Sequence, residues 1–351
     1  MKFTEAICEA HKQNLTLNNK VYIFGLGVNY ENGADGTTHN LAKHFPSRVL
    51  DVPVSELSFT GMAVGLASQG FRPTVHHGRI EFALLAIDQI LTQCSRWNYM
   101  FGGDYLCPAT FRISVGRQWG NGPQHTASYH SLFLNAPGID VFIPSSPQEA
   151  FDAIKYSVIN KFPSVILEHR WLNLVSQSVN TKKKNKKPTQ ATLYENSSKN
   201  IIVTYGDGLI ASLQAQKSLD DANIDVSVLS LNYFPSLKRL DEKVIKYILK
   251  HDNIFFVDTS PHYFGIIHGI MGQASVFNLS KKFFHIHPPF HPCPTSLKMV
   301  DSYYPSAKSI IKFIKEKTKS NKLVKFQQTF ENLHLWPNYN FDNINYKISR
   351  I

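Results

Sequence analysis

Three stretches of the sequence carry side chains that could transfer protons or bind anions. Glu56 stands in "VPVSELSF", the motif "HHGRIEF" contains His76, His77 and Arg79, and His125 stands in the loop-like stretch "WGNGPQHTASYH". Carboxyl and imidazole groups act as acids and bases near neutral pH, and guanidinium groups bind carboxylates and phosphates. Each residue also has a structural interpretation: a glutamate at the start of a helix, cations paired with acids across a subunit interface, and a histidine on a turn.

The elements that must position these residues alternate along residues 1–175. Strand-like segments such as "KVYIFGLG", "RPTVHH" and "ATFRISVG" are separated by segments whose apolar residues recur at helical spacing. This alternation predicts βαβ units and a mostly parallel sheet. Ligands bind such sheets at the carboxyl ends of the strands, so the loops after "RVLDVPVS", "RPTVHH" and "FRISVG" should share one rim. Glu56, the "HHGR" cluster with Phe82, and His125 then form one candidate site.

The chain of 351 residues is long enough for two domains. Residues 176–200 are rich in Lys, Ser and Asn, show no apolar periodicity and are interpreted as a linker. Strand and helix patterns alternate again over residues 201–318, which predicts a second α/β domain. Residues 319–351 are poorly patterned and are expected to form an irregular tail.

The net charge of +11 arises largely from lysines in "TKKKNKKPTQ" and "IKFIKEKTKSNKLVKF", which are typical of solvated linkers and tails. The sequence has no zinc-finger spacing and no aromatic-basic repeat, so nucleic-acid binding is disfavoured. No apolar run approaches the roughly 20 residues of a membrane span. Four scattered cysteines and a polar start lead us to expect a cytosolic protein with reduced thiols.

Longer segments resemble a known family. The stretches "VPVSELSFTGMAVGLASQGFRP", "EFALLAIDQILTQCSRWNYMFGG" and "GPQHTASYHSLFLNAPGIDVFIPSSPQEA" resemble, in order and spacing, the beta subunits of the thiamine-diphosphate-dependent 2-oxo acid dehydrogenases, within the transketolase-like group. The resemblance runs from about Glu5 to about Ile314. It implies an α/β fold in which a transketolase-like pyrimidine-binding domain precedes a transketolase carboxyl-terminal-like domain, each with a mostly parallel sheet flanked by helices.

The resemblance also implies roles for individual residues. Glu56 matches the carboxylic acid that bonds the cofactor's aminopyrimidine ring and drives it to the imino tautomer that takes up a proton. Phe82 matches the aromatic residue that stacks on the pyrimidine, and Gly78 lies in the same cofactor-binding stretch. His125 matches the histidine that faces the thiazolium and the substrate, where it can bond a carboxylate or an enolate-like intermediate.

The cluster of His76, His77 and Arg79 differs from the pyruvate-type beta subunits, which have one acidic residue and several apolar residues in this stretch. Two histidines and an arginine could bind a second anionic group on the substrate. They could equally pair with acids across a subunit interface. Both alternatives stay open at this point.

A further motif imitates a metal site. Gly206-Asp207-Gly208, followed by Asn232, resembles the G-D-G…N pattern that binds magnesium and the cofactor's diphosphate. The spacing is short, a second asparagine is missing, and the family places this strand in the domain that does not bind the cofactor. We therefore predict a turn at the start of a helix, and no metal site in this chain.

By this resemblance the chain holds half of an active site. An alpha-type subunit is expected to supply the diphosphate site and Mg2+, in an assembly of two alpha and two beta chains, with a lipoyl acyltransferase as a further possible partner. The chain alone should form a dimer but not turn over substrate. The leading hypothesis is decarboxylation of a 2-oxo acid with transfer of the acyl unit. The alternatives are a split transketolase-like ketol transferase and a non-catalytic structural partner.

Overall fold

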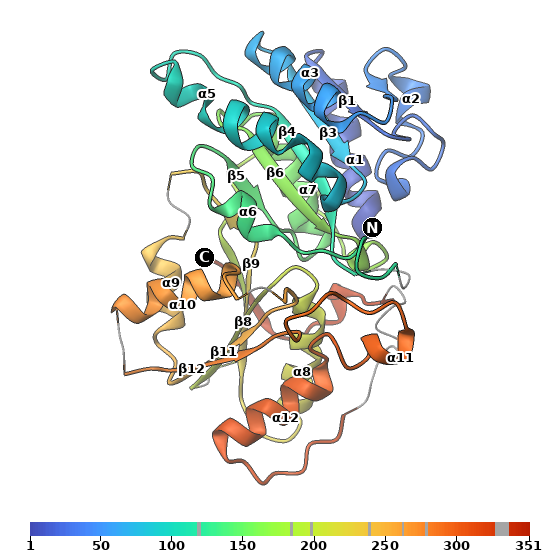
Figure 1. Ribbon diagram of the computed structural model, residues 1–351. Helices are drawn as coiled ribbons and strands as arrows, with labels where there is room; N and C mark the ends of the chain where they lie inside the picture. The colour runs from blue at the N-terminus through green and yellow to red at the C-terminus, as the bar shows by residue number, and fades with distance from the viewer. Residues whose placement is uncertain are drawn as a thin grey trace.

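The computed structural model describes residues 1–117, 121–182, 185–196, 199–237, 240–261, 263–277, 280–326 and 337–351. Its strands form a seven-stranded sheet, in the order β10-β5-β6-β4-β3-β1-β2, and a six-stranded sheet, in the order β12-β11-β8-β9-β7-β13. Figure 1 shows the first sheet and its helices in the upper half of the molecule and the second sheet in the lower half. The predicted α/β architecture with two sheets is confirmed.

The first sheet is parallel except at one edge, where β10 pairs antiparallel with β5. Helices α1 and α7 pack against each other over one face, and α3 packs over the other. The strands are β1 Val21–Gly25, β2 Val49–Leu50, β3 Arg72–His77, β4 Thr110–Val115, β5 Asp140–Phe142, β6 Ser164–His169 and β10 Tyr233–Phe234. The helical segments are α1 Phe3–Leu17, η1 Ala34–Gly36, α2 Leu41–His44, α3 Glu56–Ser68, α4 Ile80–Ala83, η2 Leu84–Ala86, η3 Asp88–Cys94, α5 Ser95–Met100, α6 His130–Leu134, α7 Pro147–Ser157 and η4 Arg170–Leu172.

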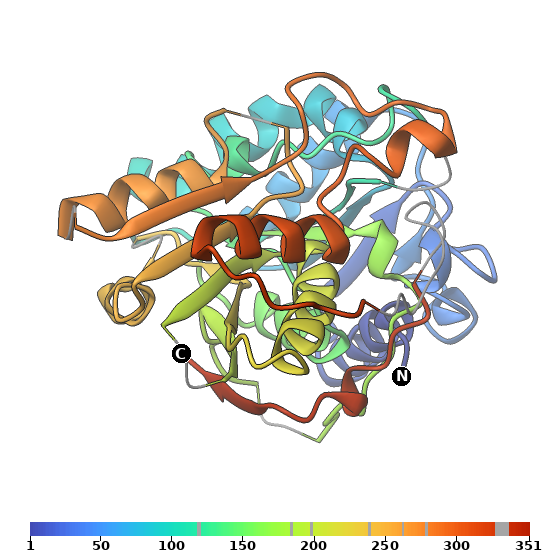
Figure 2. The same ribbon diagram turned by 90° about the horizontal axis from the view of Figure 1, so that it is seen from below.

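The second sheet has a parallel centre, β12-β11-β8-β9, and an antiparallel edge formed by β7 and β13. Its strands are β7 Ala191–Glu195, β8 Asn200–Tyr205, β9 Ser227–Leu231, β11 Asn253–Val257, β12 Lys282–Ile286 and β13 Lys347–Arg350. Its helical segments are α8 Gly208–Asp220, α9 Glu242–Ile248, α10 Ile266–Phe277, α11 Leu297–Val300, α12 Ala307–Thr318 and η5 Phe341–Asn343. Figure 2 shows α8 and α12, which contact each other, from below.

Parallel strands that are covered on both faces have no face open to solvent. Both sheets therefore bury apolar side chains on their faces. In β6, Val165 and Leu167 face the core on the α3 side, whereas Ile166 faces the core under α1 and α7. Each of these cores continues into the second sheet, through Val203 on one side and Ile202 on the other. The two sheets are thus joined by continuous apolar packing.

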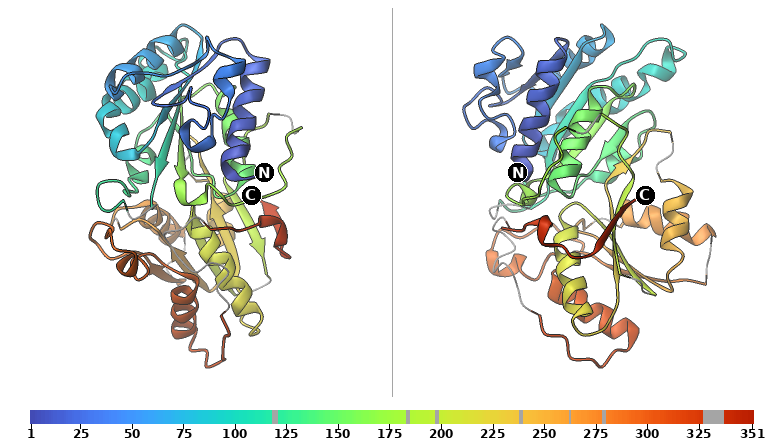
Figure 3. Two further views of the ribbon diagram at one scale, coloured as in Figure 1. Left: turned by 90° about the vertical axis from the view of Figure 1, so that its right-hand side faces the viewer. Right: turned by 180° about the vertical axis from the view of Figure 1, so that it is seen from behind.

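The ranges expected to be a linker and an irregular tail contain regular structure, namely β7, η5 and β13. The range 176–200 contains β7, so part of it belongs to the second sheet. The tail 319–351 contributes η5 and β13, and Ser176 bridges to both Lys2 and Asn340. Figure 3 shows both chain ends near the level where the two sheets meet. Residues 183–184, 197–198 and 327–336 of these ranges lie outside the described part of the chain. The exact domain boundaries stay a prediction.

Within the described ranges, no helix is both long enough and apolar enough to span a lipid bilayer.

Candidate active site

The carboxyl ends of β1, β3 and β4 lie side by side, as the parallel order predicts. Gly25 is in register with His76, and His77 is in register with Ile113. The loops that leave these strands therefore start at one end of the sheet. The segments that carry the candidate residues begin there: α4 directly follows β3, and the loop with His125 follows β4. The predicted shared rim is thus confirmed for these two strands.

Phe82 and His125 meet on this rim. Their ring centroids lie 5.7 Å apart, and the ring planes are inclined by 68°. Phe82, on α4, is 38% exposed, so part of its ring is open to a ligand or a partner. The Nδ1 atom of His125 is buried and has no hydrogen-bond partner among the described residues. An unpaired buried nitrogen costs free energy, which is a feature of sites that a bound group completes.

Glu56 is the first residue of α3 and is only 6% exposed. Ser55, not Glu56, occupies the N-cap position. The glutamate is therefore neither a cap nor a surface residue in this chain. Its neighbours Val54 and Leu57 are, by contrast, largely exposed apolar side chains. Glutamate is among the residue types that are least often buried, so the burial of Glu56 sets it apart from an ordinary surface glutamate.

The structure separates His76 from His77. Successive residues of a strand face opposite sides of the sheet. His77 is 1% exposed and packs on Phe59, with ring centroids 5.4 Å apart, and burial lowers the pKa of His77 to about 3. His76 is also buried, and burial together with the charge of Arg112 holds its pKa well below the ordinary value.

In this chain both imidazoles are buried, and their lowered pKa values favour the neutral form. Their part in binding an anion, or in pairing with a partner's acids, stays a prediction. The sequence already contained the signal that separates them, because both residues end the predicted strand "RPTVHH" and strand side chains alternate.

Arg79 lies in a small charged cluster at the same rim. It precedes α4, and burial and then the nearby Arg170 lower its pKa to about 10, while Glu81 and Asp35 oppose this change. Arg170 in turn pairs with Asp35. Arg79 is thus cationic at neutral pH and is faced by acids of its own chain. Gly78, just before it, is exposed, and a Cβ atom there would meet nothing within 4 Å.

A buried polar network links the two sheets and was not anticipated. His130, the first residue of α6, contacts His169 at the end of β6, with 2.8 Å between their Nε2 atoms. Nδ1 of His169 lies 3.0 Å from Oδ1 of Asp207, and Nε of Arg117 lies 3.0 Å from Oδ2 of the same carboxylate. Since Asp207 belongs to the second sheet's half of the chain, these contacts tie α8 to the first sheet.

The Gly206-Asp207-Gly208 motif accordingly has a structural role, in which Asp207 pairs with Arg117 and His169. Asp207 is the residue before α8, so the predicted helix-start turn is confirmed. Burial on its own would raise the pKa of Asp207, but His169 and Arg117 outweigh it and hold that pKa well below the ordinary value. No group of three or more His, Cys, Asp or Glu suited to a metal ion occurs in the part of the chain that the structure describes.

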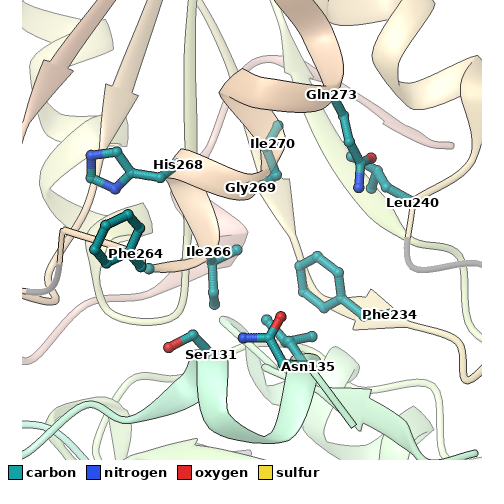
Figure 4. Close-up of a pocket in the computed structure, with 12 residues that line it drawn as sticks. Ser131, Asn135, Phe234, Leu240, Phe264, Ile266, His268, Gly269, Ile270 and Gln273 are labelled. Carbon is teal, nitrogen blue, oxygen red and sulfur yellow. The ribbon is translucent and has the colours of Figure 1, made fainter. Parts of the chain in front are cut away.

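Two hollows adjoin α6. Figure 4 shows the first, of about 360 Å³, where Ser131 of α6 and Asn135, just after that helix, face Ile266 and Phe234. The second, of about 550 Å³, shares Ser131 and Asn135 and extends to Leu84 beside α4. Their walls are mainly apolar, so this side of the molecule offers a surface that another chain or a ligand can cover.

Comparison with known proteins shows the family. The protein family described as "Transketolase, pyrimidine binding domain" matches residues 1–173 of this chain. The mitochondrial pyruvate dehydrogenase E1 component subunit beta of Pisum sativum is 30% identical over 258 residues, which cover 72% of this chain and 71% of the pea protein. The corresponding Saccharomyces cerevisiae protein is 28% identical over 329 residues, covering 90% and 88%, and that of Rickettsia conorii is 28% identical over 323 residues, covering 89% and 96%.

The chain belongs to the beta-subunit family of the thiamine-diphosphate-dependent 2-oxo acid dehydrogenases. A solved structure titled "Split gene transketolase, inactive beta4 tetramer" has the same fold, with a TM-score of 0.72 at 17% identity, and the match covers 90% of this chain and 98% of that one.

Three side chains are of the types that the aminopyrimidine part of thiamine diphosphate needs: the carboxyl group of Glu56, the partly exposed ring of Phe82 and the imidazole of His125. Phe82 and His125 are in ring contact, whereas the joint role of the three residues stays a prediction.

Proposed function

We propose that this chain is the beta-type subunit of an enzyme that decarboxylates a 2-oxo acid and transfers the acyl unit, with Glu56 and His125 as its catalytic residues. The contact between Phe82 and His125, at 5.7 Å between ring centroids, carries this proposal. It is supported by the burial of Glu56 on α3, because α3 and α4 both contact β3.

Each residue has a distinct task in this proposal. Thiamine diphosphate, when bound, supplies a carbon nucleophile formed by loss of a proton. Glu56 would share its carboxyl proton with the pyrimidine ring nitrogen, as a general acid in a site with little water. Phe82 would pack against the ring face, and the open backbone at Gly78 would let the cofactor approach. His125 would donate from its imidazole to the substrate carboxylate or to negative charge that develops on oxygen.

An alpha-type partner completes the site in this proposal. Exposed apolar residues flank the candidate site, with Leu57 54% and Leu85 63% exposed, and such side chains favour coverage by another subunit. Asp207, the acid of the imitation magnesium motif, is already paired with Arg117 and His169. We therefore place Mg2+ and the diphosphate on the alpha-type chain. Self-association to an assembly of two alpha and two beta chains, and a lipoyl acyltransferase as acyl acceptor, belong to the same proposal.

A ketol transferase is the second candidate. The cationic Arg79, beside Arg170 at the rim, is the observation that favours it, since guanidinium groups bind phosphorylated sugars well. The fold match to a split transketolase is compatible with this activity. A non-catalytic structural partner is the third candidate, and the combination of a buried Glu56 with the ring contact of Phe82 and His125 argues against it.

One experiment tests these candidates together. The chain is produced with an alpha-type chain encoded beside its gene, and the complex is purified with thiamine diphosphate and magnesium. The complex is then screened with 2-oxo acids and with ketose phosphates. Release of carbon dioxide from a 2-oxo acid supports the first proposal, whereas ketol transfer alone would replace it with the second. A stable complex that binds the cofactor and turns over neither class would favour the structural partner.

A further inference from the structure

The peptide group of Ala127 is held on both sides, two residues after His125. Its N–H donates a hydrogen bond of 2.7 Å to Oε1 of Glu81, and its carbonyl accepts one of 3.0 Å from the N–H of Gly116. Gly116 directly follows β4, and Glu81 lies on α4. The loop is therefore fastened between the end of a strand and a neighbouring helix at this residue.

Helix α4 contacts the loop through two successive residues. Glu81 bonds the backbone of Ala127, and Phe82 packs its ring against the ring of His125. Neighbouring residues of a helix point about 100° apart, so these two contacts reach the loop at separate places. A single ring contact leaves the loop free to rotate about it. A second contact, to the backbone, removes that freedom.

Two further hydrogen bonds near His125 stay within the turn itself. The hydroxyl of Thr126 donates to the carbonyl of Gly122 at 2.7 Å, and the N–H of His125 approaches the same carbonyl at 3.4 Å. Both bonds close the turn on itself. The bond from Ala127 to Glu81 differs because it spans 46 positions of the sequence and ends on the helix that carries Phe82.

We propose that Glu81 is a positioning residue that sets the place of His125 against Phe82, and so against the cofactor and the substrate. This inference rests on the proposed function of His125. A carboxylate suits the task because a hydrogen bond from an N–H to a charged acceptor is about twice as strong as one between neutral groups. The cations Arg79 and Arg170 and the acid Asp35 lie near the same helix end and complete the charged surroundings of Glu81.

Three variants of the full-length chain test the inference. Glu81→Ala removes the acceptor, and Glu81→Gln keeps an oxygen acceptor without the charge. Asp88→Asn is the matched control, because Asp88 loses the same charge nearby while bonding only weakly, at 3.4 Å, to the side chains of Gln89 and Gln93. Amide hydrogen exchange of peptides that cover residues 121–129 reports the freedom of the loop, and peptides from α1 and β8 report the rest of the fold.

We expect Glu81→Ala to speed exchange of the loop about 10-fold or more, with a smaller change in Glu81→Gln and none in Asp88→Asn. In the assembled enzyme, kcat of Glu81→Ala should fall about 10- to 100-fold, and Glu81→Gln should recover part of that loss. Unchanged loop exchange in Glu81→Ala would overturn the inference, and so would faster exchange throughout the chain, which means general destabilisation. Faster loop exchange with wild-type kcat would also overturn the positioning role.

Failure of the proposed function gives a different result. If His125→Ala keeps wild-type activity in the assembled enzyme, His125 has no catalytic role, whatever the loop exchange shows. The two readouts therefore separate the positioning of the loop from the task of the residue that it carries.

Discussion

Replacing Asp207 by asparagine should weaken the whole structure, because this one carboxylate contacts both the Arg117 guanidinium, which follows β4, and the His169 imidazole at the end of β6. Arg117 and His169 each place a nitrogen 3.0 Å from it, and all three side chains are buried. Its lowered pKa means that this contribution is complete above pH 3.8 and is lost only as the pH falls through the still lower value in the folded protein. The variant removes the negative charge at neutral pH and leaves Arg117 uncompensated.

The expected cost follows from the surroundings of Arg117. Breaking a buried ion pair by removing one partner costs about 3–5 kcal/mol. The Arg117 guanidinium also lies 3.9 Å from the ring centroid of Trp171 and 4.5 Å from that of Tyr304, and these cation–π contacts survive in the variant. Asp207 makes no capping hydrogen bond to α8, so no cap is lost. We therefore expect the lower end of the range, about 3 kcal/mol.

Urea unfolding followed by tryptophan fluorescence measures this cost, since Trp171 lies on the affected guanidinium. A loss of about 3 kcal/mol should lower the midpoint by about 1 M or somewhat less, because the slope m is large for a chain of this size. Glu316→Gln breaks an exposed pair with Lys312 and should change the stability by less than about 0.5 kcal/mol. Replacing Arg117 by methionine together with Asp207→Asn should recover part of the stability. An Asp207→Asn midpoint equal to that of the wild type would refute the reasoning.

Three further outcomes are expected. Glu56→Gln should lower the cofactor-dependent activity of the assembled enzyme about 100-fold or more without changing its size on gel filtration, and full activity would contradict the role of Glu56. Gly138→Ala should cost about 3 kcal/mol in urea unfolding, because its Cβ would lie 2.0 Å from the Ser95 carbonyl oxygen at a φ of +84°, whereas Gly65→Ala, with nothing within 4 Å, should be neutral or stabilising. Burial lowers the pKa of His77 from 6.5 to about 3 in the folded protein. Above pH 6.5 the residue is neutral in both the folded and the unfolded chain, and below it the unfolded chain binds a proton that the folded chain does not, so stability falls with the pH. His77→Phe should therefore make the loss of stability from pH 6 to 4 shallower by about 1.4 kcal/mol per pH unit, and an equal slope would contradict this burial argument.

The positions of many strands could be anticipated from local patterns. Strands β3, β4 and β6 are short segments with β-branched or aromatic residues between turn residues, and that signal is contained within each segment. The short strands β7, β10 and β13 were not anticipated. Each consists of two to five residues and exists because a partner far away in the chain supplies its hydrogen bonds, as β13 does for β7.

By itself the sequence determined the alternating architecture and the family, and it indicated Glu56, Phe82 and His125 as candidates, because these depend on segment patterns and on motifs that the chain carries whole. Tertiary structure alone decided that Glu81 holds the loop of His125 and that Asp207 joins the two halves of the molecule. Such contacts join residues separated by tens of positions, and their partners are selected by packing distance and burial. A linear pattern records neither quantity.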